Sequence, residues 1–206
     1  MTDHFLLLRQ PRQPWLELDP LKELFLRLSA EVHPDHCHAA SEAIKDSANE
    51  RFAELNAAYG CLRDLKSRLL HLLELELGAS PKDIQRIPPG TMDLAMEIGQ
   101  TCREVDDFMV ARAKVSSPML KVQVFQRGME WTDKVTALQQ KVNAKLDELM
   151  AELQTMNRVW ESAPALGTPG RAAALSLDRL ELIYRALSYI GRWTQQLQER
   201  LVQLAI

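Results

Sequence analysis

The residues with the greatest capacity for chemistry lie together in the segment His33-Pro34-Asp35-His36-Cys37-His38. Its three imidazoles and one thiol are ligand types that bind zinc. Zinc sites usually take two separated pairs of ligands, however, and no second Cys or His pair stands nearby in the sequence. A metal site formed by His33, His36, Cys37 and His38 therefore remains an alternative to a solvated histidine-rich loop, and we expect neither a metal nor another cofactor.

Nucleophilic catalysis by Cys37 beside a histidine is another interpretation of this segment. Neighbouring residues of one exposed loop seldom hold the geometry that a nucleophile and its base require. None of the patterns G-x-S-x-G, G-x-x-x-x-G-K-[ST], G-x-G-x-x-G and H-E-x-x-H occurs in the chain. We therefore expect that the protein is not an enzyme.

Composition excludes several further classes. The net charge of −3 gives no electrostatic basis for nucleic-acid binding. Three widely spaced cysteines without a C-x-x-C pair argue against a disulfide framework and fit a reducing compartment. The apolar run at residues 5–8 is too short for a signal peptide, and no run reaches the roughly 18 residues of a membrane span. We expect a soluble cytoplasmic protein without membrane partners.

Helical patterns flank the histidine-rich segment on both sides. Asp19-Pro20 reads as a cap and first helical position, and apolar residues then recur at helical spacing until Val32. Pro34 must end this helix. A second helix is predicted from Ser41, with its stripe at Ile44, Ala48, Phe52, Leu55, Tyr59 and Leu62. Two amphipathic helices joined by a short polar loop predict an antiparallel hairpin.

The rest of the chain also reads as helices. A Leu-rich helix is predicted over 65–77, ending at Gly78, and Pro and Gly residues mark a boundary at 78–90. Three further helices follow, of which the second, from Met119 to about Trp160, would bend or end at Gly128. The prediction is an all-α protein with a helical hairpin domain at 1–77, a linker at 78–90 and a three-helix bundle at 91–206.

The hairpin resembles the J-domain of DnaJ-type co-chaperones. The tripeptide His33-Pro34-Asp35 follows a capped amphipathic helix, and "FAELNAAYGCLRD" stands at the expected distance after it. The continuations "LKSRLLHLLELELG" and "TMDLAMEIGQTCREVDDF" are similar to the HscB subclass, which acts in iron–sulfur cluster assembly. The resemblance covers nearly the whole chain and is most specific in the first 77 residues.

This resemblance implies a co-chaperone that stimulates the ATPase of a DnaK-type (HscA-like) chaperone. His33, Pro34 and Asp35 would be the required contacts, and Lys22 and Arg27 would add positive charge. Acidic and apolar residues dilute the charge of that helix, so a helical adaptor with a degenerate J-domain is an alternative.

The resemblance also implies a client, an IscU-like iron–sulfur scaffold protein, bound by the first helix of the C-terminal bundle. The matching positions are Met92, Asp93, Met96, Glu97, Gln100 and Glu104. Met92, Met96, Gln100 and Glu104 step by four and so share one helix face. The competing interpretation buries Met92 and Met96 against the other helices of the bundle.

Overall fold

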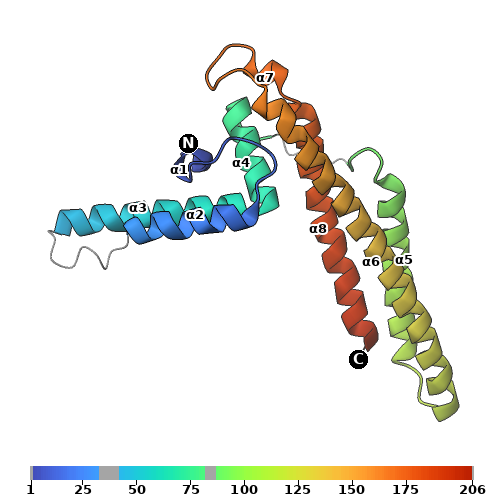
Figure 1. Cartoon of the computed structure of the whole chain (residues 1–206). Coiled ribbons are helices and arrows are strands. Elements are labelled where there is room, and N and C mark those ends of the chain that lie inside the picture. Colours follow the sequence, from blue (N-terminus) through green and yellow to red (C-terminus); the bar gives the residue numbers. More distant parts are fainter. Residues whose placement is uncertain (1, 33–41, 82–86, 206) are drawn as a thin grey trace. The chain divides into compact units, whose positions relative to one another are not determined.

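The computed structural model describes residues 2–32, 42–81 and 87–205, and every regular element in these ranges is a helix (Figure 1). The predicted all-α class is therefore confirmed. The helices are α1 (His4–Leu7), α2 (Leu18–Glu31), α3 (Glu42–Arg63), α4 (Leu65–Leu77), α5 (Met92–Arg112), α6 (Pro118–Glu161), α7 (Arg171–Ala174) and α8 (Leu177–Ala205). None of the helices in the described ranges is both long and apolar enough to cross a bilayer.

The chain divides into two compact units. Unit 1 holds Met1–Asp83 together with Glu152–Tyr184, and unit 2 holds Ile84–Ala151 together with Arg185–Ile206. The C-terminal end of α6, all of α7 and the start of α8 thus belong to the same unit as the N-terminal helices. The domain boundaries predicted from the sequence (1–77, 78–90 and 91–206) assume that each domain is one continuous segment. They remain a prediction.

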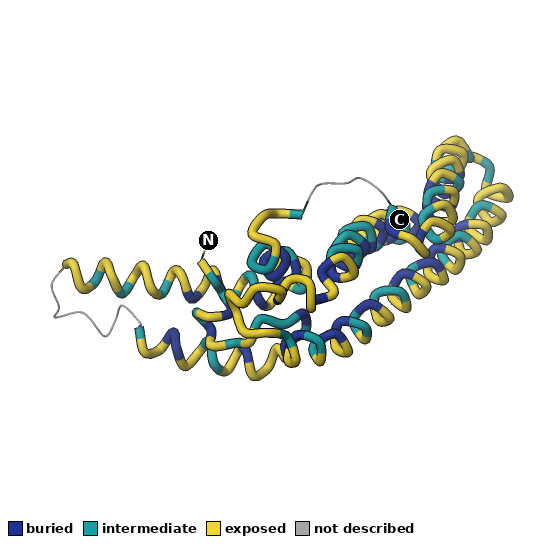
Figure 2. The backbone as a smooth tube through the Cα atoms, turned by 90° about the horizontal axis from the view of Figure 1, so that it is seen from above, coloured by how far each residue is buried: buried dark blue, intermediate teal, exposed yellow. Residues whose placement is uncertain are grey.

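Helices α2 and α3 form the predicted hairpin within unit 1 (Figure 1). The rings of Phe25 and Tyr59 stack with centroids 4.2 Å apart, and Leu21 of α2 and Leu55 of α3 are buried as well. The first half of α3 contributes no buried residue, and Ile44 is 53% exposed, so the predicted stripe is core only from Leu55 onward (Figure 2). Burial is concentrated where α1 and α4 also pack on α3.

The predicted start of α2 was wrong by two residues. The helix begins at Leu18 with Glu17 in the capping position, and no side chain caps it. Asp19 and Pro20 lie inside the first turn. A proline is tolerated there because its missing N–H would have no intrahelical partner, and an acid favours the positive end of the helix dipole.

Helix α4 has the predicted bounds, and both of its ends are capped. The Asp64 side chain accepts a hydrogen bond from Ser67 N at 2.8 Å. At the other end Gly78 adopts φ +73°, a left-handed conformation that glycine enters without a steric penalty. Asp64, the residue between α3 and α4, is thereby held by its hydrogen bond to the first turn of α4.

Arg68 of α4 ties three segments of unit 1 together. Its side chain is 2% exposed, and it donates to Pro14 O at 3.1 Å and to Leu62 O at 2.6 Å. Leu62 belongs to the last turn of α3, where carbonyl groups lack intrahelical donors. Burial lowers the pKa of Arg68 to about 10, so the guanidinium stays charged at neutral pH.

The bundle of unit 2 is made by α5, the first part of α6 and the end of α8 (Figure 1). Helix α6 runs uninterrupted through Gly128, which is where the sequence predicted a bend or an end. A Cβ placed on Gly128 would lie 3.8 Å from the Phe108 ring, so this glycine sits close against α5. Arg200 of α8 pairs with Asp106 of α5 at 2.9 Å.

Arg68→Ala should destabilise the protein. The substitution leaves the Pro14 and Leu62 carbonyls without their donor, and we expect the free energy of unfolding to fall by about 2–4 kcal/mol. Urea titration followed by circular dichroism measures it. The matched control is Arg51→Ala on the exposed surface of α3, expected within about 0.5 kcal/mol of the parent. Equal effects of the two substitutions would contradict the role given to Arg68.

Candidate partner-binding surfaces

The predicted chaperone-contact tripeptide lies outside the described residues. His33, Pro34 and Asp35 fall between the end of α2 at Glu31 and the start of α3 at Glu42. His36, Cys37 and His38, the further members of the alternative metal site, fall there too. The structure therefore describes the two helices on either side of this segment. The chaperone contact and the alternative metal site both stay predictions.

The predicted basic contacts lie on the surface of α2. Lys22 and Arg27 are both exposed. Glu23 and Leu26 are exposed beside them, and Leu26 is 55% accessible. The described part of this surface is thus a mixture of charges with an apolar residue, and its positive potential is weak.

The predicted client face lies on the outside of α5. Met92 and Met96 are 50% and 67% exposed, and Asp93, Glu97 and Gln100 are exposed as well. Glu104 is partly covered. The core of α5 is made by its other side, through Ile98, Thr101, Cys102, Val105 and Phe108. The interpretation that buries Met92 and Met96 in the bundle is therefore wrong.

The acidic members of this face pair with lysines of α6. Glu97 contacts Lys141 at 2.7 Å and Glu104 contacts Lys134 at 3.0 Å. Moving seven residues forward on α5 moves seven residues backward on α6, as an antiparallel pair of helices requires. Both ion pairs are largely exposed and contribute little to stability, but together they show the register of the two helices.

Gln100 joins the same network. Its side-chain amide donates to Glu104 at 2.8 Å, and its carbonyl oxygen accepts from Arg103 at 2.7 Å. The hydrogen bond from Gln100, followed by that from Lys134, lowers the pKa of the Glu104 carboxyl. Lys134 and Lys141 were missed in the sequence. Their spacing of seven matches that of Glu97 and Glu104, and this is the signal that a search for paired faces would use.

On the last helix, Ala186 is 4% exposed and belongs to the core of unit 2. Tyr189 packs against Trp193 with ring centroids 5.8 Å apart. Tyr184 lies in unit 1, with the Lys66 ammonium 5.8 Å from its ring centroid.

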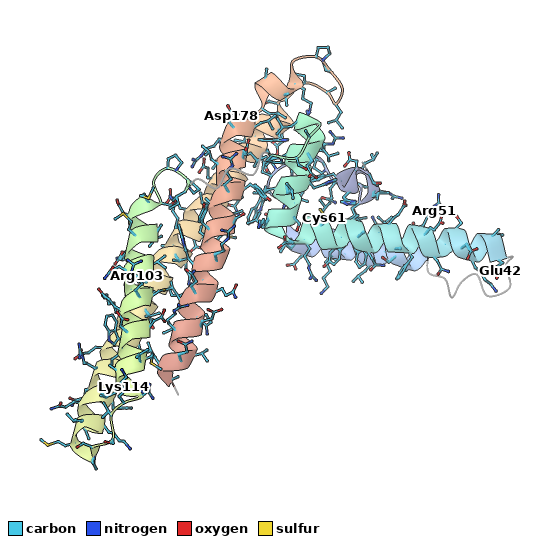
Figure 3. All side chains as sticks on the ribbon, turned by 180° about the vertical axis from the view of Figure 1, so that it is seen from behind. Glu42, Arg51, Cys61, Arg103, Lys114 and Asp178 are labelled. Atoms are coloured by element: carbon cyan, nitrogen blue, oxygen red, sulfur yellow. The ribbon has the colours of Figure 1, made fainter. Side chains whose placement is uncertain are left out.

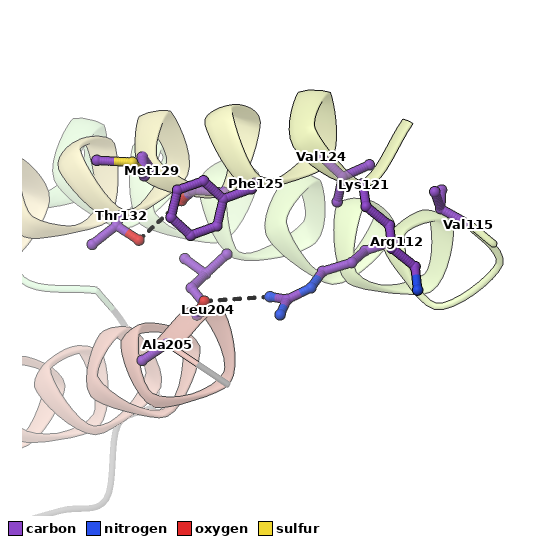
Figure 4. Close-up of a pocket in the computed structure, with 10 residues that line it drawn as sticks. Arg112, Val115, Lys121, Val124, Phe125, Met129, Thr132, Leu204 and Ala205 are labelled. Carbon is purple, nitrogen blue, oxygen red and sulfur yellow. Dashed lines mark hydrogen bonds between the residues drawn. The ribbon is translucent and has the colours of Figure 1, made fainter. Parts of the chain in front are cut away.

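A separate cavity of about 540 Å³ lies where α5 and α8 end and α6 begins (Figure 4). Phe125, Val124 and Met129 of α6 line it with Leu204 of α8. Arg112 also lines the cavity and donates to Leu204 O at 3.3 Å. Its ten lining residues include no member of the predicted client face.

Comparison with known proteins gives a consistent answer. No protein-family model matches the chain. A protein of Paraburkholderia xenovorans (strain LB400), named "Co-chaperone protein HscB homolog", is 29% identical over 203 residues, which are 95% of each chain. A protein of the same name from Burkholderia vietnamiensis is 28% identical over 202 residues, again 95% of each chain. The chain is thus similar to HscB co-chaperones over nearly its whole length.

A solved structure supports the fold of this HscB-like chain. The crystal structure of the human co-chaperone protein HscB superposes with a TM-score of 0.55, covering all of this chain and 83% of the human chain at 20% identity. At that identity the likeness establishes the all-helical HscB fold alone. The agreement extends over the whole length of the chain and so includes the C-terminal bundle.

Met92→Ala combined with Met96→Ala should leave stability unchanged. Both side chains are at least half exposed, so we expect the free energy of unfolding to stay within about 0.5 kcal/mol of the parent. Ile98→Ala is the contrast on the same helix, because Ile98 is 1% exposed and its truncation should cost about 2–5 kcal/mol. Chemical denaturation measures all three. A large loss in the double variant would return the methionines to the core.

Proposed function

We propose that this chain stimulates the ATPase of a DnaK-type (HscA-like) chaperone in the cytoplasm and presents an IscU-like iron–sulfur scaffold protein to it as client. The contacts with the chaperone are His33, Pro34 and Asp35, with Lys22 and Arg27 beside them. The protein performs no catalysis of its own, because the ATP is hydrolysed in its partner.

One observation carries this proposal. The sequence His33-Pro34-Asp35 joins the two helices of a hairpin in a chain that is HscB-like over 95% of its length. Proline restricts the backbone, so a loop that contains it loses less entropy on docking. A carboxylate such as that of Asp35 can accept two parallel hydrogen bonds from an arginine of the partner.

The client surface is supported by exposure and chemistry. Met92 and Met96 present flexible, polarisable side chains on one face of α5, and such side chains suit adaptable protein recognition. Asp93, Glu97, Gln100 and Glu104 surround them with polar groups. A partly apolar centre with a polar rim is the usual composition of a protein interface.

An adaptor without chaperone stimulation is a second candidate. The observation that favours it is the exposed surface of α2, where Glu23 and Leu26 stand beside Lys22 and Arg27. Electrostatic steering toward an acidic partner would be weak on this surface. The first experiment below separates the two candidates.

Asp35→Asn should abolish most of the stimulation. Single-turnover ATP hydrolysis by the HscA-like chaperone is measured with and without the full chain. We expect the parent to accelerate hydrolysis and the variant to lose at least about tenfold of that effect, because a hydrogen bond to a charged group contributes roughly 1.5–3 kcal/mol. Asp46→Asn, the same change at an exposed position of α3, is the matched control and should stimulate normally.

The adaptor interpretation predicts another outcome of that assay. If the parent chain leaves hydrolysis unchanged, or if Asp35→Asn stimulates as well as the parent, the tripeptide has no role in ATPase control. Binding of the scaffold would then be the remaining function of the chain.

Met92→Ala with Met96→Ala should weaken scaffold binding while stimulation without scaffold stays intact. Truncating two side chains that become buried at an interface should raise the Kd roughly 10- to 100-fold. Isothermal titration calorimetry measures it. The control pair is Met119→Ala with Met129→Ala, two exposed methionines of α6 outside this face, and should bind normally. Equal affinity of both pairs would remove α5 from the interface.

A further inference from the structure

His4, Cys61 and His71 come together within unit 1. Each offers one ligand atom, and the three atoms lie within 4.8 Å of one another. They come from three elements: His4 begins α1, Cys61 lies in the last turn of α3 and His71 lies in the middle of α4 (Figure 3 labels Cys61). We propose that His4, Cys61 and His71 form a binding site for Zn²⁺ or a divalent transition metal of similar preference.

The donor set has the chemistry that zinc prefers. Two imidazole nitrogens and one thiolate sulfur are borderline to soft ligands, and Zn²⁺ takes such N/S sets in tetrahedral sites. Zinc–ligand bonds of about 2.0–2.3 Å place neighbouring ligand atoms about 3.3–3.8 Å apart. Small side-chain rotations close the present spacing to that range, since all three residues line one surface hollow of about 580 Å³.

One atom of the cluster lacks a partner that a metal would supply. His4 Nδ1 is buried from solvent and has no hydrogen-bond partner in the described structure. A buried nitrogen without a partner is costly. The imidazole that carries this nitrogen offers a ligand atom within 4.8 Å of those of Cys61 and His71.

The second imidazole is already held in place. His71 is 6% exposed, its ring stacks on Phe5 with centroids 5.9 Å apart, and its Nε2 accepts from His4 N at 3.1 Å. A neutral ring that binds metal through one nitrogen carries its proton on the other. A metal on Nε2 would occupy the lone pair that accepts from His4 N, and a metal on Nδ1 would leave the proton on Nε2. In both cases the hydrogen bond from His4 N is lost when the metal binds.

Cys61 must lose a proton for the site to form. Its thiol donates to Ser67 O at 3.6 Å, and burial raises its pKa to about 11. Binding exchanges the S–H bond for an S–Zn bond and releases the proton to solvent. Glu74 lines the same hollow and provides a carboxylate that, with water as the alternative, completes the fourth position.

A metal in this position would fasten the N-terminal segment to the hairpin. It would connect α1 to both α3 and α4, which are joined otherwise by packing and by the His4–His71 hydrogen bond. Because the site is assembled only in the folded chain, zinc should raise the midpoint of thermal unfolding.

The test uses the full chain and Zn²⁺ itself, in competition with a chromogenic zinc chelator. We expect one bound zinc per chain, and Cys61→Ser and His4→Gln should each weaken binding by at least about 100-fold, since loss even of outer-shell partners costs about 10- to 100-fold. Co²⁺ substitution gives a second readout. Thiolate-to-cobalt charge transfer should appear in the parent and vanish in Cys61→Ser, with folding checked by circular dichroism.

Two controls separate this site from other sources of zinc binding. Cys102→Ser removes the buried cysteine of α5, and His36→Ala with His38→Ala removes ligands from the histidine-rich segment. Both should bind zinc as the parent does. Absence of zinc binding, full affinity in Cys61→Ser and His4→Gln, or loss of binding in the His36/His38 variant would each overturn the proposal.

Discussion

The architecture of unit 1 depends on a buried charge. Arg68 supplies donors to a carbonyl before α2 and to a carbonyl at the end of α3, while its own helix is α4. Burying a guanidinium is expensive unless its donors are used, so the three segments must meet in one arrangement for the charge to be tolerated. Arg68 thereby joins α4 to the segment before α2 and to the end of α3, while the tripeptide at 33–35 follows the opposite end of α2 in the sequence.

The sequence predicted most helices because their signals are local. Apolar residues at helical spacing, Gly78 after α4 and prolines between α4 and α5 each act within a few residues. The start of α2 was misplaced because Asp19 and Pro20 fit the first turn as well as the cap. Gly128 was misread because α6 continues through it and the residue packs beside Phe108, which lies twenty residues earlier in the chain.

The surfaces were less predictable than the helices. A spacing of four put Met92, Met96, Gln100 and Glu104 on one face, but only the packed bundle shows that Met92 and Met96 are exposed. Lys134 and Lys141 enter that region from α6, and the His4–Cys61–His71 cluster joins residues up to 67 positions apart. The periodicity of one segment cannot show which residues of a distant segment it meets, so these contacts were not predicted.

The ion pairs between α5 and α6 have a consequence for recognition. A partner that offered cations to Glu97 or Glu104 would have to displace Lys141 or Lys134, so one exposed ion pair would be exchanged for another. Such an exchange yields little net Coulomb energy, and its dependence on ionic strength is small. Affinity on this face would then come from apolar area removed from water, and association would tolerate a wide range of salt concentrations.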